Sequence, residues 1–138
     1  MLRTTWEDGE RGRILVFLDS SESMALTDEH MDAGRKLYLF DTFNGFDPRD
    51  LTVEVQQEDK FNPSNFSDTD VEIVRAYIGG NDKLIFKKGY FPETTLGLEN
   101  ERFALVHLDA DLYVPTLEAL KFFYPKMNPG GVIIIHDY

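Results

Sequence analysis

Residues 103–113 read FALVHLDADLY, and this stretch decides the fold. It opens with an apolar run over residues 103–106 and closes on two carboxylates, Asp109 and Asp111. A short apolar run that ends in acidic residues and precedes a helical pattern predicts a buried parallel strand of an α/β sheet. Ligands of open α/β sheets bind outside the carboxyl ends of the strands. We therefore expect Asp109 to lie where the chemistry takes place.

Other apolar runs repeat this design along the chain, with helical patterns and turn residues between them. Strands that alternate with helices at this spacing predict a single α/β domain with a doubly wound, mostly parallel sheet. The predicted strands span residues 14–18, 37–40, 84–86, 103–108 and 132–135.

The connections are predicted from capping and turn residues. Asp70 stands three residues after Ser67, a capping-box pattern that precedes a helix beginning near residue 71. A later helix is expected to begin at Thr116 and to place Tyr124 on its buried face, and residues 128–131, NPGG, predict a turn. The acidic stretch 47–59 reads as a solvated excursion rather than a site.

The amino-acid composition excludes several classes of function and partner for this protein. The chain has 138 residues, a formal net charge of −11 and no cysteine. The negative charge argues against nucleic acid and anionic membrane as partners. No apolar run approaches the ~20 residues that a membrane span needs. The absence of cysteine excludes disulfides and thiol catalysis and is compatible with a cytoplasmic location.

From Arg35 onward, about three quarters of its length, the chain resembles the macrocin O-methyltransferase (TylF-like) family. The resemblance implies a Rossmann-like fold and methyl transfer from S-adenosylmethionine, assisted by Mg²⁺, to a sugar or other small-molecule hydroxyl. It also divides the chain into a divergent segment, 1–34, and a methyltransferase-like core, 35–138. The stretches that carry it are KLYLFDTFNGF (36–46), FKKGYFPETTLGL (86–98), FALVHLDADLY (103–113) and FFYPKMNPGGVIIIHDY (122–138).

The resemblance implies cofactor-binding roles for residues after the second and third strands. An acid at the end of the second strand, Asp41, can accept hydrogen bonds from the ribose hydroxyls of the cofactor. Thr42 and Phe43 would lie beside it. Gly89 and Tyr90 follow the third strand and would lie near the adenine.

The catalytic and metal-binding roles fall on the last two strands. Asp109 and Asp137 are the candidate Mg²⁺ ligands, because this ion prefers hard carboxylate oxygens. A metal ion there would lower the pKa of the acceptor hydroxyl. Asp111, His107 or His136 could serve as the general base. The plainer alternatives are that strand-end acids cap loops and that His107 is a core residue bonded to the backbone.

Three features depart from the family pattern. Family members usually carry two acids before the final Tyr, whereas this chain has His136 and Asp137. The position of the Gly-rich cofactor loop holds residues 18–23, LDSSES, without glycine. The chain also ends before the C-terminal strands that close such sheets, so the last strand is expected to be an uncovered edge that favours a homodimer.

A competing motif gives an alternative function. Asp19, Ser21 and Ser23 fit the pattern D-x-S-x-S after an apolar run. This pattern resembles the metal-ion-dependent adhesion site of von Willebrand A-type domains, where such oxygens hold Mg²⁺. The alternative is therefore a metal-dependent binding module.

Overall fold

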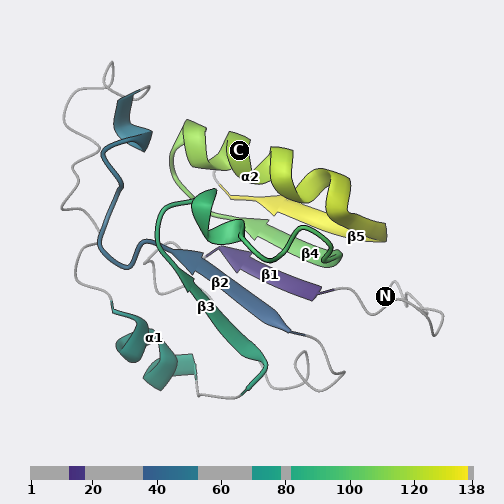
Figure 1. The fold of residues 1–138 in the computed structure, drawn as a ribbon, viewed down its shortest axis with the longest axis horizontal. Helices are drawn as coiled ribbons and strands as arrows, with labels where there is room; N and C mark the ends of the chain where they lie inside the picture. Colours follow the sequence, from purple (N-terminus) through teal and green to yellow (C-terminus); the bar gives the residue numbers. More distant parts are fainter. Residues whose placement is uncertain (1–12, 18–35, 53–69, 79–81, 137–138) are drawn as a thin grey trace.

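The computed structural model describes residues 13–17, 36–52, 70–78 and 82–136 (Figure 1). Asp19, Ser21, Ser23, Ser67 and Asp137 lie outside these ranges. No helix in the described ranges is both long and apolar enough to cross a membrane. The described strands are β1 (Arg13–Phe17), β2 (Leu37–Asp41), β3 (Leu84–Lys88), β4 (Phe103–Leu108) and β5 (Met127–Ile135), the α-helices are α1 (Val71–Ile78) and α2 (Tyr113–Phe123), and three short 3-10 helices are η2 (Asp50–Thr52), η4 (Glu93–Thr95) and η5 (Tyr124–Lys126).

The strands form one sheet in the order β3-β2-β1-β4-β5, and each neighbouring pair is parallel. The chain moves from β1 outward to β3 on one side and then crosses back to β4 and β5 on the other. The order therefore reverses between β1 and β4, and ligands of doubly wound sheets bind at such a switch point. This confirms the predicted Rossmann-like, doubly wound sheet.

Alternate residues of the strands face two different cores, as the period-two geometry of strands requires. Tyr38 and Phe40 belong to a core that includes Phe123 of α2. Leu37 and Leu39 belong to a second core, against which Ile78 of α1 packs. Figure 1 shows α2 in front of β4 and β5, and α1 beside β3. Two helices thus cover opposite faces of the sheet.

The helix α2 begins earlier than the sequence indicated. It runs from Tyr113 with Leu112 as its N-cap, so the prediction that Thr116 caps the helix was wrong. The Thr116 hydroxyl instead donates a hydrogen bond to the Leu112 carbonyl at 2.8 Å, within the helix. The prediction for Tyr124 was also wrong, because this residue follows the helix and is 74% exposed.

The glycine pair before the last apolar run lies inside β5, which begins at Met127 rather than Val132. The pairing of β4 with β5 shifts register between Phe103 and Leu105. A Cβ on Gly131 would lie 2.9 Å from the Asn128 carbonyl oxygen and 3.1 Å from the Ala104 carbonyl oxygen at this irregularity. The glycine is therefore explained by close backbone approach at a bulge, not by the turn that the sequence predicted.

Candidate functional site

The two acids that end β2 and β4 lie level with each other at the carboxyl edge of the sheet. Phe40 is paired with Phe17, so Asp41 stands one residue beyond the end of β1. His107 is paired with Val16, so Asp109 also stands one residue beyond that end. Strands β2 and β4 both adjoin β1, and strand spacing places them roughly 10 Å apart. Two carboxylates therefore flank the switch point of the sheet.

Asp109 is buried and contacts His136. Its side chain is 7% exposed, and its Oδ1 lies 3.1 Å from Nδ1 of His136. The backbone N–H of His136 donates to the Leu108 carbonyl at 2.9 Å. This hydrogen bond continues the pairing of β4 with β5 and keeps Asp109 and His136 next to each other. The rings of His136 and His107 are 6.2 Å apart between centroids. Three candidate residues therefore meet at the ends of β4 and β5.

Asp111 lies in a tight turn between β4 and α2. Its φ is 54°, in the left-handed region that side chains other than glycine seldom adopt. The next residue, Leu112, donates its N–H to the Ala110 carbonyl at 2.6 Å. The turn exposes Asp111 while Asp109 remains buried. Two acids only two residues apart thus have different surroundings, which suits them to different roles.

The loop after β2 is shaped by Asp41. The backbone N–H of Phe43 donates to Asp41 Oδ1 at 2.8 Å, and Phe43 has a φ of 52°. A bulky residue in the left-handed region is a genuine outlier, and such conformations cluster at functional sites. The Thr42 hydroxyl donates to the Gly45 carbonyl and accepts from the Asn44 N–H at 3.3 Å. Asp41, Thr42 and Phe43 therefore form one ordered turn.

The loop after β3 is joined directly to this turn. The Gly89 N–H donates to the Asp41 carbonyl at 2.9 Å. Gly89 has a φ of 137°, and a Cβ there would lie 3.1 Å from Cγ2 of Thr94, so a larger residue would be strained. Tyr90 follows at once. The structure thus brings together the five residues for which the resemblance implies cofactor contacts: Asp41, Thr42, Phe43, Gly89 and Tyr90.

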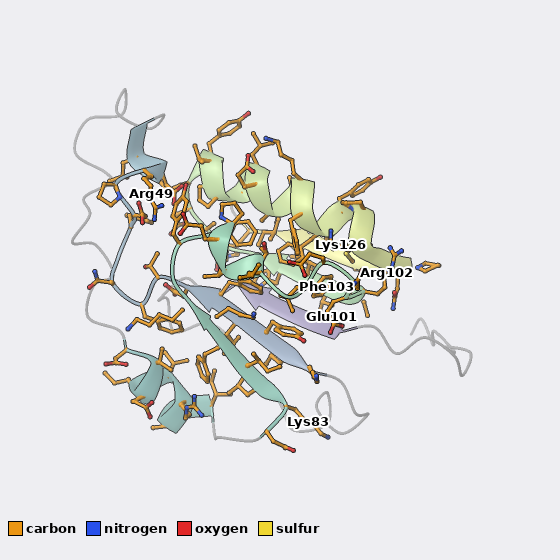
Figure 2. The ribbon with its side chains drawn as sticks, viewed as in Figure 1. Arg49, Lys83, Glu101, Arg102, Phe103 and Lys126 are labelled. Atoms are coloured by element: carbon orange, nitrogen blue, oxygen red, sulfur yellow. The ribbon has the colours of Figure 1, made fainter. Side chains whose placement is uncertain are left out.

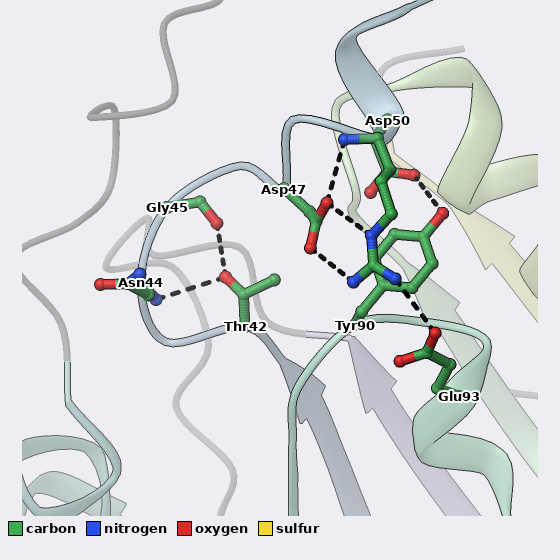
Figure 3. Close-up of polar contacts among 8 residues, drawn as sticks. Thr42, Asn44, Gly45, Asp47, Asp50, Tyr90 and Glu93 are labelled. Atoms are coloured by element: carbon green, nitrogen blue, oxygen red, sulfur yellow. Dashed lines mark hydrogen bonds and ion pairs between the residues drawn. The ribbon is translucent and has the colours of Figure 1, made fainter.

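A cluster of charged residues bridges the same two loops and was not predicted from the sequence (Figure 3). Arg49 lies with its guanidinium carbon 3.5 Å from the centroid of the Tyr90 ring. It is bonded to Asp47 by two hydrogen bonds of 2.9 Å, and its Nη1 lies 3.0 Å from Glu93 Oε1. Tyr90 donates its hydroxyl to Asp50 Oδ1 at 3.1 Å.

The ionisation of this cluster reflects its surroundings. Burial raises the pKa of Asp50 to about 6, against the opposing effect of the Tyr90 hydrogen bond. Burial also raises the pKa of Tyr90. The hydrogen bonds from Arg49 lower the pKa of Asp47, which stays ionised. Asp50 is 6% exposed, so the expectation that residues 47–59 form a solvated excursion was wrong at this residue. Its acidic neighbours in the sequence gave no sign of burial.

Figure 2 shows on which side of the sheet this cluster lies. Arg49 is at the end where the strands finish, whereas Glu101 and Arg102 lie at the other end, next to the start of β4. The candidate cofactor residues, the Asp109–His136 pair and the charged cluster therefore share the carboxyl side of the sheet.

Of the two expected metal ligands, only one lies in the part of the chain that the structure describes. Across residues 13–17, 36–52, 70–78 and 82–136, no three His, Cys, Asp or Glu side chains gather as metal ligands would. Asp109 is placed, but its expected partner Asp137 is outside these ranges. Asp19, Ser21 and Ser23 of the alternative adhesion site are outside them too.

Known proteins show the same fold. The O-methyltransferase NovP matches with a TM-score of 0.61 and 25% identity over 79% of this chain and 48% of its own. The calicheamicin methyltransferase CalS11 matches in fold, with a TM-score of 0.63 and 18% identity over 91% of this chain and 57% of its own. Both likenesses extend over most of this chain.

Two sequence relatives are O-methyltransferases by name. The 8-demethyl-8-(2,3-dimethoxy-alpha-L-rhamnosyl)-tetracenomycin-C 4'-O-methyltransferase of Streptomyces olivaceus is 33% identical over 79% of this chain and 44% of its own length. The mycinamicin III 3''-O-methyltransferase of Micromonospora griseorubida is 29% identical over 75% of this chain and 44% of its own. The chain thus spans less than half the length of these curated relatives.

The family comparison covers nearly the whole chain. The sequence pattern of macrocin-O-methyltransferase (TylF) matches residues 11–138, which include β1 and the stretch of Asp19, Ser21 and Ser23. The adhesion-site alternative therefore gains no support. With the strand order and the relatives in agreement, this chain belongs to the macrocin O-methyltransferase (TylF) family.

Proposed function

We propose that this chain is the cofactor-binding part of a cytoplasmic O-methyltransferase that uses S-adenosylmethionine and Mg²⁺. The acceptor is a hydroxyl of a sugar or of a similar small molecule. The observation that carries the proposal is the level placement of Asp41 and Asp109 on either side of the switch point. A cofactor and an acceptor held beside these two acids would meet at the crevice where such sheets bind their ligands.

The turn after β2 suits the ribose of the cofactor. When bound, S-adenosylmethionine supplies an electrophilic methyl group. The Asp41 carboxylate is the acceptor that ribose hydroxyls require, and the Phe43 N–H holds its Oδ1 in place. Gly89 brings backbone close to Asp41, and Tyr90 is the next residue along the chain. These residues would bind and orient the nucleoside end of the cofactor.

The ends of β4 and β5 suit the acceptor. A Mg²⁺ ion held by Asp109 and Asp137 would supply positive charge that favours ionisation of the acceptor hydroxyl. Carboxylate oxygens fit this ion, whereas the imidazole beside Asp109 is a softer ligand. Asp111 or His136 would accept the hydroxyl proton. The main contribution of the protein is then to align acceptor and methyl group.

Two partners complete the proposal. The acceptor named for the Streptomyces olivaceus relative carries a rhamnosyl group, so we assign this chain a hydroxyl of a sugar or of a similar small molecule as its acceptor. A second copy of the chain would pair along β5, which ends the sheet order and exposes Val132 and Ile134 at 51% and 46%. Nucleic acid and membrane are not partners in this proposal.

Calorimetric titration of the purified chain with S-adenosylmethionine, with and without Mg²⁺, tests the cofactor assignment. Asp41→Asn should weaken binding by about tenfold or more, because hydrogen bonds to a charged group contribute about 1.5–3 kcal/mol. Asp82→Asn is the matched control, since Asp82 is an exposed acid just before β3. A folded wild-type chain that binds no cofactor would overturn the proposal, and equal binding by Asp41→Asn would remove Asp41 from the site.

A further inference from the structure

The loops after β2 and β3 are joined by a group of side chains that we call the Arg49 clasp: Asp47, Arg49, Asp50, Tyr90 and Glu93 (Figure 3). The first three follow β2 and the last two follow β3, so the clasp links segments about 40 residues apart in the chain. Its members lie close together only because β2 and β3 are neighbours in the sheet.

Arg49 is the centre of the clasp. Its planar guanidinium is paired with both Asp47 carboxylate oxygens, which fixes its orientation. In that orientation the guanidinium covers one face of the Tyr90 ring, and its Nη1 contacts the Glu93 carboxylate. An isolated surface ion pair contributes little to stability, but a bidentate pair within a network holds a defined geometry. Arg49 therefore constrains where the Tyr90 ring can lie.

The opposite edge of Tyr90 is held as well. Its hydroxyl donates to Asp50, which is buried where α2 packs against η2. The ring is thus fixed by stacking on one face and by a hydrogen bond at its tip. Gly89, the residue before it, is bonded to the Asp41 carbonyl. A movement of Tyr90 would therefore disturb the Gly89–Asp41 junction.

We propose that Arg49 is a positioning residue that sets the affinity for the nucleoside part of the cofactor by holding Tyr90 in place. The inference rests on the proposed function, because it requires that S-adenosylmethionine binds beside Asp41 and Tyr90. It goes beyond that function by assigning a role to a residue outside the five for which cofactor contacts are expected. Arg49 acts indirectly, by holding the Tyr90 ring in place.

Lysine cannot replace arginine in this role. A lysine at position 49 keeps the positive charge but lacks the planar fork that pairs with Asp47 and stacks on Tyr90. If Arg49 serves only as a surface charge, Arg49→Lys will behave as the wild type. If it positions Tyr90, both Arg49→Lys and Arg49→Gln will bind the cofactor more weakly. The conservative variant thus separates positioning from simple charge.

The experiment is a calorimetric titration with S-adenosylhomocysteine and with 5'-methylthioadenosine, which retains only the nucleoside part. Arg49→Gln and Arg49→Lys should each raise Kd about fivefold for both ligands, a change equivalent to about 1 kcal/mol of binding free energy. An equal loss for both ligands locates the effect at the nucleoside end. Arg102→Gln is the matched control, because Arg102 is exposed and lies at the other end of the sheet (Figure 2).

The outcomes separate the two proposals. Wild-type chain that binds neither ligand overturns the proposed function, and this inference with it. Wild-type binding with unchanged Kd in Arg49→Gln overturns the inference alone. Glu93→Gln provides a milder second variant should Arg49→Gln fail to fold, since it removes one ion pair from a side chain that is 69% exposed. It should weaken nucleoside binding in the same direction, and unchanged binding there would count against the clasp.

Discussion

The imidazole of His136 and the carboxylate of Asp109 contact each other at the carboxyl edge of the sheet, with Nδ1 3.1 Å from Oδ1. The contact follows from the pairing of β4 with β5, in which Leu108 is level with Ile135. Asp109 follows Leu108 and His136 follows Ile135, so these two residues are also level with each other. One member is buried and the other is exposed, so a change in either alters the surroundings of a buried carboxylate.

Replacing Asp109 by asparagine should abolish metal binding with little loss of fold. Asparagine keeps the shape of the side chain and an oxygen that can accept from His136, but it removes the charge that attracts a cation. We expect the free energy of unfolding to fall by about 1–2 kcal/mol, the usual size for an altered buried hydrogen bond. Titration with Mn²⁺ followed by electron paramagnetic resonance measures the metal directly. Undiminished Mn²⁺ affinity in the variant would remove Asp109 from the metal site.

Replacing His136 by aspartate should strengthen metal binding. The change restores the two acids that the family resemblance implies before the final Tyr, and it puts a second hard oxygen ligand beside Asp109. Without metal, two neighbouring carboxylates repel each other, so the melting temperature should fall. Added Mg²⁺ should restore it more than it does for the wild type.

His136→Asn is the control for that experiment, because it removes the imidazole without adding charge. Differential scanning calorimetry at several Mg²⁺ concentrations distinguishes the two variants. A Mg²⁺ response of His136→Asp no larger than that of His136→Asn would contradict the prediction.

The buried Asp50 should make the stability of the chain depend on pH. Burial raises its pKa from 3.8 to about 6, with Asp47 adding to the rise and with Tyr90 and Arg49 opposing it. Between these two values the folded state binds more protons than the unfolded state, so stability falls as pH increases. The contribution is fully present below about pH 4 and is lost as pH rises through about 6.

Asp50→Asn should remove this pH dependence, since asparagine does not titrate. Urea unfolding at pH values from 4 to 7.5 measures the free energy of unfolding of both proteins. We expect the variant to gain stability relative to the wild type as pH rises through this range. Parallel stability curves for the two proteins would show that Asp50 does not titrate with a raised pKa.

The backbone at Asp111 predicts an unusual pattern of substitutions. At a φ of 54°, glycine is free of the steric cost that a Cβ brings, and asparagine tolerates this region well. Asp111→Gly and Asp111→Asn should therefore fold as stably as the wild type. Asp111→Val should lose about 1–2 kcal/mol. Chemical denaturation gives these values, and a valine variant as stable as the glycine variant would contradict the left-handed turn.

The exposed side of β5 predicts self-association. Val132 and Ile134 are exposed on a strand at the end of the sheet order, and an edge strand with apolar side chains can pair with a second copy. Ile134→Lys should shift the chain toward monomer in sedimentation-velocity experiments. Ile73→Lys is the control, since Ile73 is 59% exposed on α1, away from that edge. A wild-type chain that stays monomeric at high concentration would refute the dimer.

Several features were determined locally and could be predicted from the sequence. The apolar runs ending at Asp41 and Asp109 identified two strands and placed both acids at a ligand-binding edge. Such runs are informative because a strand buried on both faces has few polar residues. The start of α2 and the position of Gly131 could not be predicted in this way. Helix α2 has no side-chain cap that would mark where it begins. The need for glycine at position 131 depends on how closely β5 approaches Ala104.

The sequence by itself determined the class of sheet and the acids at the strand ends, because period and punctuation are properties of neighbouring residues. The family was indicated by the resemblance of four stretches of the chain to known proteins, not by these patterns. Only the tertiary structure decided which of these side chains meet. Arg49 covers Tyr90, and Asp109 contacts His136, across strand pairs that bring distant segments together. The burial of Asp50 likewise depends on packing between loops and α2, and its raised pKa follows from that burial.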